Sequence, residues 1–336
     1  MGRIFLTFVC LIAGVSIALA EWSYDRNAAD GPKKWGDSCS GSQQSPIDIS
    51  TTAATYDSSL GNFTLVNYAN TPAGVNFTAK NSGKSLKVAM DSHIYNVSGG
   101  GLPGVYTTVQ FHLHWGSNNN KGSEHTMDGL MYPAEIHFVS MNTKYSSLGD
   151  SLGHSDGLAV LGVFLKVGSS EHRHYKLFLD HVSSVINKGI AVLSSQKHPY
   201  CKSLLKRFSQ FIFRYTGESV SFPAFPLMNL LPIDKTKYFR YPGSLTTPPC
   251  SEAVTWTVFK DPIEISQAQL DALRSMKMNS TMNIVDNYRP VLDLGSRKLK
   301  ASFDEGLKQA DPTAAGVVLK ISNVVLLLVL FLGAVF

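Results

Sequence analysis

The feature that most constrains the fold is an almost wholly apolar run of ten residues, 158–167 (LAVLGVFLKV). An apolar run of this length suits a strand that is buried on both faces near the middle of a large sheet. Between residues 62 and 166 apolar side chains recur at every second position, as in Phe77 and Ala79. Since residues two apart on a strand point to the same face, this alternation predicts a succession of half-buried strands.

Helical patterns are few and short. Residues 178–188 place four apolar side chains on one face and end at a glycine, as many helices do. Residues 266–276 open with Ser266 and Gln269, which have the spacing of a capping box. No internal repeat or low-complexity linker interrupts residues 21 to about 305, so we predict one sheet-dominated domain over 21–305.

The first twenty residues are typical of a signal peptide. Arg3 precedes an apolar run over residues 4–17, and Ala18-Leu19-Ala20 matches the small-x-small pattern that signal peptidase cuts. The run is shorter than the roughly 20 residues that a membrane-spanning helix needs, which argues against a retained anchor. We therefore predict a signal peptide over residues 1–20.

The chain ends in a second apolar run, residues 324–336, with no charged residue after it. Small residues at 314–316 and a short spacer precede the run, a pattern typical of a glycosylphosphatidylinositol (GPI) signal. We predict a linker and anchor-attachment region over 306–315 and a removed propeptide over 316–336, and a transmembrane tail is the alternative. The expected location is the extracellular face of the plasma membrane, with secretion as the alternative.

The charge balance is unremarkable for a globular protein. The formal net charge of +5 falls by two when Arg3 and Lys320 leave with the terminal segments. Nucleic-acid-binding domains carry a much stronger basic excess, so no nucleic-acid partner is expected.

The cysteines fit an oxidising compartment. Cys10 belongs to the predicted signal peptide, so the mature chain keeps Cys39, Cys201 and Cys250. Three cysteines in such a compartment predict one disulfide and one remaining thiol. No pair has the Cys-x-x-Cys spacing, which makes zinc ligation by cysteine improbable.

A histidine pattern carries the chemistry. On a strand, His112 and His114 would present their rings on one face, and a neighbouring strand could bring His137 to complete a triangle. Three histidines leave the fourth corner of a tetrahedral zinc site open, as in catalytic sites. Gln110 and Glu135 lie two residues before His112 and His137, where they could accept the second ring proton.

Two further segments support a site over an ordinary half-exposed sheet. Glu124 places a carboxylate close in sequence to the histidine strands, within Gly122-Ser123-Glu124-His125-Thr126. The proline-bounded segment 241–249 offers the hydroxyls of Thr246 and Thr247 on a stiff loop. Taken alone, either segment could be a surface turn.

Seven strings then point to one family. QQSPIDI, QFHLHWG, GSEHT, PAEIHFV, LAVLGVFLKVG, YPGSLTTPP and NYRP occur in this order, and the chain resembles the alpha-class carbonic anhydrases from about Trp22 to Leu299, in particular their extracellular, GPI-anchored members. The resemblance implies a β-dominated α/β fold. It would be a single domain built on one large, mostly antiparallel twisted sheet with a few peripheral helices.

The resemblance implies a zinc cofactor and a reaction. The zinc ligands would be His112, His114 and His137, with Gln110, Glu135 and the backbone of Asn287 as their hydrogen-bond partners. The reaction would be the reversible hydration of carbon dioxide to bicarbonate and a proton, through attack by zinc-bound hydroxide. Implied partners are carbon dioxide and bicarbonate, sulfonamide and anion inhibitors, a membrane reached through the lipid anchor, and a bicarbonate transporter.

Further roles follow from the same resemblance. Thr246 would accept the proton of the hydroxide and donate its own to Glu124, and Thr247 would contact bicarbonate. His93 would carry the released proton to solvent, because histidine is the side chain whose ordinary pKa lies near neutral pH. Tyr24 and Asn96 would order the connecting water. The apolar wall that receives carbon dioxide would consist of Val139, Val160, Leu245, Val254 and Trp256.

The resemblance also bears on covalent modification. Cys39 and Cys250 match positions at which extracellular members carry a disulfide. Sequons make Asn62, Asn76 and Asn279 glycosylation candidates. Asn96 also lies in a sequon, but a glycan there would cover the cavity, so we expect it to be unmodified.

One segment departs from the family. Residues 189–216 are extra, contain Cys201 and carry five basic residues without an acidic one. One interpretation is a basic loop that docks on anionic lipids or a partner, and the other is a non-functional segment such as retained non-coding sequence. The second interpretation is favoured, because the residues of the segment form no pattern with a shared chemical role.

Two other functions compete with hydration. A carbonic-anhydrase-like binding module would have lost activity, yet such modules typically lack zinc histidines, and here all three are present. A zinc esterase would use the same nucleophile as a side activity. The joint presence of the three histidines, Glu124 and Thr246 favours carbon dioxide hydration.

Overall fold

The computed structural model describes residues 22–90, 93–186, 191–192, 213–214, 219–305 and 307. The predicted signal peptide, the C-terminal propeptide and Cys201 lie outside these residues, as does most of the extra segment 189–216. None of the helices in the described ranges is both long and apolar enough to cross a membrane.

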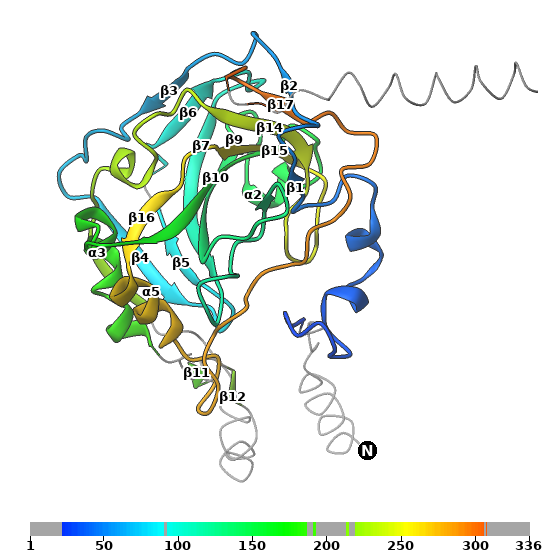
Figure 1. Ribbon diagram of the computed structural model, residues 1–336. Coiled ribbons are helices and arrows are strands. Elements are labelled where there is room, and N and C mark those ends of the chain that lie inside the picture. The colour runs from blue at the N-terminus through cyan, green and yellow to red at the C-terminus, as the bar shows by residue number, and fades with distance from the viewer. Residues whose placement is uncertain are drawn as a thin grey trace, which may run out of the picture.

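A 13-stranded sheet dominates the described chain (Figure 1). All but three of its strand pairs are antiparallel, which confirms the predicted fold class. The order across the sheet is β13 (Ser219–Pro223), β4 (Asn76–Asn81), β5 (Leu86–Ala89), β7 (Tyr106–Trp115), β9 (Ala134–Asn142), β10 (Leu158–Gly168), β15 (Val254–Phe259), β14 (Tyr238–Gly243), β17 (Lys300–Ala301) and β2 (Thr55–Tyr56). The strands off this path are β3 (Phe63–Val66), β6 (Asn96–Gly99) and β16 (Ile263–Ser266).

Two small sheets accompany the large one. β1 (Asp48–Ile49) pairs in parallel with β8 (Thr126–Met127), next to the loop that carries Glu124. β11 (Ala191–Val192) pairs antiparallel with β12 (Phe213–Arg214). The second pair brings together two short pieces of the extra segment, near its two ends.

The apolar run 158–167 forms β10, a central strand of the sheet. Its first eight residues are buried, and it pairs with β9 on one side and with β15 and β16 on the other. The alternating strands also form as predicted, since Phe77 and Ala79 on β4 are buried while their neighbours are more exposed. Burial on both faces therefore explains the continuous run, and one-sided burial explains the alternation.

The two faces of the sheet carry separate apolar cores. On one face Phe111, Leu113 and Trp115 of β7 join a large cluster covered by helices α3 (Arg173–Leu179) and α5 (Gln267–Arg274), which lie together in Figure 1. On the other face a second cluster includes Val160 and Trp256. The candidate site opens into this second face, between the sheet and α2 (Leu148–Ser151).

One helix forms as predicted and the other does not. α5 begins at Gln267 with Ser266 as its N-cap, and the capping box with Gln269 is complete. The helix expected over 178–188 instead forms as α3, which ends at Leu179, followed by a separate short turn, η3 (Val182–Val185). α3 begins at Arg173 because the His172 side chain accepts the Tyr175 backbone N–H as the N-cap, and after Leu179 the His181 ring stacks on Phe222 where a longer helix would have continued. The remaining short helices are η1 (Pro32–Lys34), η2 (Asp37–Ser40) and η4 (Leu227–Leu230).

Candidate functional site

Three histidines meet on two neighbouring strands. β7 and β9 pair antiparallel, and the register sets His112 directly opposite His137. His114 lies two residues further along β7 and faces the same way. The ring centroids are 5.0 Å apart for His112 and His114, 5.2 Å for His112 and His137, and 4.7 Å for His114 and His137. One nitrogen from each ring lies within 4.8 Å of the other two.

Each of the three rings is held through its other nitrogen. The distances are 3.0 Å from His112 Nδ1 to Gln110 Oε1, 2.7 Å from His114 Nδ1 to the Asn287 carbonyl, and 2.7 Å from His137 Nε2 to Glu135 Oε1. These contacts fix which nitrogen carries the proton, as partners of metal-bound histidines do. The nitrogens left to converge are Nε2 of His112, Nε2 of His114 and Nδ1 of His137.

The chemistry of these nitrogens fits a zinc ion. His114 Nε2 is buried and has no hydrogen-bond partner among the described residues, an expensive state for an isolated polar atom. Burial is the main cause that lowers the pKa of all three rings, to about 3 for His114 and well below the usual value for His112. Neutral imidazole is the form that binds metal, so the histidines are ready to coordinate.

A second cluster of His125, Glu135 and His137 also brings ligand atoms within 4.8 Å. In that cluster Glu135 Oε1 lies 2.7 Å from His125 Nδ1 and 2.7 Å from His137 Nε2. Because these atoms already pair with one another, this cluster supports the metal-binding histidines and does not form a second metal site.

Glu124 lies beside the histidines in full burial. One carboxylate oxygen accepts the Arg289 backbone N–H at 2.8 Å, and the other lies 3.4 Å from His114 Nε2. Burial raises the pKa of Glu124 well above its usual value, whereas the Arg289 N–H and the Thr246 hydroxyl act in the opposite direction. The carboxylate is therefore held toward both the histidines and the Thr246 loop.

A cavity of about 180 Å³ opens above the histidines. His112, His137, Thr246 and Thr247 line it together with apolar side chains. Of the predicted apolar wall, Val139, Val160, Leu245 and Trp256 line the cavity, but Val254 does not. Val254 is instead enclosed in the apolar cluster that includes Val160 and Trp256. The wall also includes Leu148, Leu152 and Leu158, which no sequence pattern predicted.

Comparison with known proteins identifies the family. The model of eukaryotic-type carbonic anhydrases matches residues 30–217 and 190–303. The chain belongs to this family. Carbonic anhydrase 3 of Homo sapiens is 35% identical over 294 residues, which cover 84% of this chain and 98% of that protein. Carbonic anhydrase 7 of Mus musculus is 36% identical over 292 residues, with 84% and 97% covered. The chain is thus a carbonic anhydrase, and the family catalyses the hydration of carbon dioxide and uses zinc.

The residues predicted for proton transfer lie at different depths in this carbonic anhydrase. His93 is exposed, three residues before β6, with a positive φ of 51°. Asn96 is half-buried on β6, where its side-chain oxygen accepts a hydrogen bond from the Thr107 hydroxyl at 2.7 Å. Tyr24 is buried with its ring edge-on to His114, and burial raises its pKa well above the usual value. Of the three, only Tyr24 contacts a predicted zinc ligand.

The glycosylation candidates differ in exposure. Asn62 and Asn76 are exposed, and Asn279 is half-buried with its side-chain oxygen accepting hydrogen bonds from Thr281 and Met282. Glycosylation of the three, and its absence at Asn96, stay predictions.

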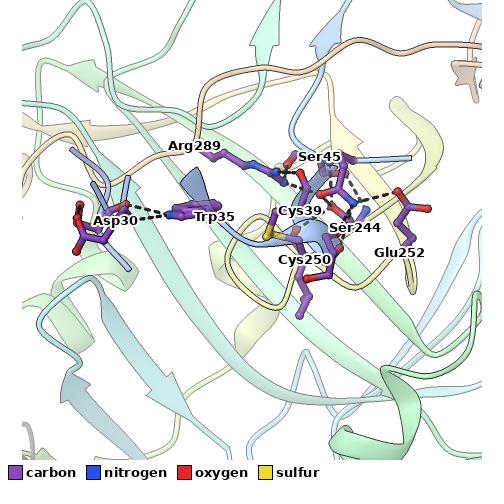
Figure 2. Close-up of a disulfide and its surroundings, with 12 residues drawn as sticks. Asp30, Trp35, Cys39, Ser45, Ser244, Cys250, Glu252 and Arg289 are labelled. Carbon is purple, nitrogen blue, oxygen red and sulfur yellow. Dashed lines mark hydrogen bonds between the residues drawn. A yellow bond between two sulfur atoms is a disulfide. The ribbon is translucent and has the colours of Figure 1, made fainter. Parts of the chain in front are cut away.

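The disulfide expected from the family resemblance is present between Cys39 and Cys250 (Figure 2). Cys250 ends the loop that carries Thr246, and the bridge ties this loop to the N-terminal segment. Hydrogen bonds strengthen the junction, since Gln44 Nε2 donates to the Cys250 carbonyl and the Arg289 guanidinium donates to the Cys39 carbonyl. A hollow of about 520 Å³ beside the bridge contains none of the three histidines.

Three residues behind the metal-binding histidines were not predicted from the sequence either. His125 is buried between Glu135 and Tyr241, and Ser45 lies behind Tyr241. Each lies inside a family string, GSEHT, YPGSLTTPP or QQSPIDI, which was the only available signal. Nothing in local spacing indicates that these strings meet.

We expect the double substitution Cys39→Ser with Cys250→Ser to lower the free energy of unfolding by about 2–5 kcal/mol, because the bridge restricts the unfolded chain across a separation of 211 residues. Urea denaturation checks this value. A reducing agent should lower the free energy of unfolding of the native protein by a similar amount and leave that of the double variant unchanged. Equal midpoints for native and variant proteins would contradict the prediction.

Proposed function

We propose that this carbonic anhydrase hydrates carbon dioxide reversibly with a zinc ion held by His112, His114 and His137, at the extracellular face of the plasma membrane. The observation that carries the zinc assignment is the convergence of three neutral imidazole nitrogens, of which His114 Nε2 is buried and unpaired among the described residues. When bound, zinc would lower the pKa of a coordinated water to about 7, an effect for which carbonic anhydrase is itself the reference case.

The chain's own residues would orient the reaction. The Thr246 hydroxyl would donate its proton to Glu124 and accept one from the nucleophile, which aims the nucleophile at the substrate. Support comes from the burial of both residues and from the effect of Thr246 on the pKa of Glu124. Thr247 would contact bicarbonate at the cavity wall.

The apolar wall would receive carbon dioxide, which has little to hydrogen-bond. Val139, Val160 and Trp256 line the cavity together with His112 and His137, and Leu148 of α2 and Leu152, its C-cap, add further apolar surface. Such a wall favours an apolar substrate by keeping ordered water from competing for the site.

The first test is stopped-flow carbon dioxide hydration by the purified protein, beside a zinc assay. We expect about one zinc per chain, as a three-histidine site requires, and hydration that a zinc-binding sulfonamide abolishes. His112→Ala should lower hydration by more than about 100-fold, since loss of an outer partner alone costs about 10–100-fold. His154→Ala removes an exposed histidine that belongs neither to the metal-binding cluster nor to the cavity lining, and it serves as the control.

The outcomes separate the competing functions. A protein that binds zinc but does not hydrate carbon dioxide would favour a binding module. Hydrolysis of activated esters that disappears together with hydration in His112→Ala would mark esterase chemistry as a side activity of the same site.

His93 would transfer the product proton between the cavity and solvent, with Tyr24 and Asn96 ordering the connecting water. The exposure of His93, three residues before β6, supports this role. A side chain positioned for proton transfer typically raises the reaction rate by about 10²–10⁴-fold.

We expect His93→Ala to lower kcat at least about 10-fold in dilute buffer while kcat/KM stays within about twofold, because the proton leaves after the hydration step. Stopped-flow kinetics measure both constants, and a high concentration of imidazole buffer should restore kcat. Equal losses in kcat and kcat/KM would assign His93 to another role.

The extracellular location rests on the two terminal segments and on four sequons. The anchor would hold the enzyme near a bicarbonate transporter in the same membrane. We expect phosphatidylinositol-specific phospholipase C to release the activity from expressing cells, and removal of residues 316–336 to send it into the medium. Activity that stays on treated cells would exclude the lipid anchor and favour a transmembrane tail.

A further inference from the structure

His125 is a buried histidine that the proposed reaction does not use. It lies immediately before β8 and is 0% exposed. Its Nδ1 lies 2.7 Å from Glu135 Oε1, and its Nε2 lies 2.6 Å from the Tyr241 hydroxyl. Both ring nitrogens are therefore engaged, in opposite directions.

On one side, His125 shares Glu135 with a metal-binding histidine. Glu135 Oε1 also lies 2.7 Å from His137 Nε2, and Oε2 accepts the backbone N–H groups of Glu124 and His125, each at 2.9 Å. A Cβ at Gly162, on the adjacent strand, would come within 3.1 Å of Oε1. The carboxylate is thus confined by hydrogen bonds and by the backbone, and His125 is one of the groups that fix it.

On the other side, the contacts reach the loop of Thr246. The Tyr241 hydroxyl lies 3.0 Å from Ser45 Oγ, and Ser45 Oγ accepts the Ser244 backbone N–H at 3.0 Å. The Ser45 N–H in turn donates to Ser244 Oγ at 3.0 Å. Ser244 lies two residues before Thr246, so a continuous hydrogen-bonded path runs from His137 to this loop.

We propose that His125 and Tyr241 are positioning residues that couple the orientation of His137 to the position of the Thr246 loop. The proposal rests on the proposed zinc function. Every side chain along the path, from His137 through Glu135, His125 and Tyr241 to Ser45 and Ser244, is at most 1% exposed. Water cannot readily replace a lost partner at such depth, so breaking one contact leaves polar atoms unpaired and disturbs both ends.

Tyr241→Phe is the decisive variant, because it removes one hydroxyl and contacts neither a metal-binding histidine nor Thr246 through that atom. We expect zinc release to a chelator about 10-fold faster than in the native protein, at the low end of the 10–100-fold cost of losing an outer partner. The kcat for hydration should fall as well. The control is Tyr175→Phe, which removes an equally buried hydroxyl that donates to the Leu230 carbonyl. Its rate of zinc release and its kcat should both stay within about twofold of the native values.

A double-mutant cycle separates coupling from general destabilisation. If the path acts through Glu135, then Tyr241→Phe combined with Glu135→Gln should release zinc no faster than Glu135→Gln alone. Additive effects, or zinc release from Tyr241→Phe at the native rate, would overturn the proposal. His125→Gln keeps a donor and an acceptor, so its rate of zinc release should lie between the rates of the native protein and Tyr241→Phe. Zinc release from His125→Gln that is slower than from the native protein would also contradict the proposal.

The same experiment distinguishes this inference from the proposed function. If the native protein neither binds zinc nor hydrates carbon dioxide, the proposed function is contradicted, whatever the variants show. If the native protein binds zinc and hydrates carbon dioxide, but Tyr241→Phe behaves like Tyr175→Phe, only the proposed coupling is contradicted.

Discussion

The antiparallel pairing of β7 with β9 is the constraint on which the site depends. Its register sets His112 opposite His137, and the two-residue period of β7 adds His114 to the same face. A shift of one residue would turn the histidines into the apolar core and bring Phe111 and Leu113 to the cavity. Correct burial of one face of β7 therefore guarantees the presentation of the histidines on the other.

Long-range contacts then complete what the strands begin. Asn287 comes from the C-terminal part of the chain, yet its carbonyl holds His114 and its side chain holds the backbone of Trp115. The disulfide brings the N-terminal segment against the Thr246 loop, and Arg289 reaches both the Cys39 carbonyl and, through its N–H, Glu124. Segments from both ends of the domain are thus needed to form a single centre.

The site combines two environments in a small volume. The histidines and Glu124 are almost fully enclosed except for His112, while the opposite wall of the cavity is apolar. Enclosure keeps the imidazoles neutral and ready for a cation, and it also makes each polar partner expensive to lose. The same physical cause that prepares the metal centre therefore explains why so many hydrogen bonds surround it.

The sequence by itself determined the strand pattern, the buried central strand, the α5 capping box and the three histidines, because periodicity and capping are local properties. The two-residue spacing also indicated the partners Gln110 and Glu135, and the family strings added the cysteine pair and Asn287, all of which the structure brings into contact. Only the tertiary structure decided where α3 ends, that Val254 is enclosed in an apolar cluster, that Leu148 and Leu152 line the cavity, and that His125 links Glu135 to Tyr241. These features depend on contacts between segments far apart in the chain, and no local pattern specifies which side chain fills the space that another element leaves.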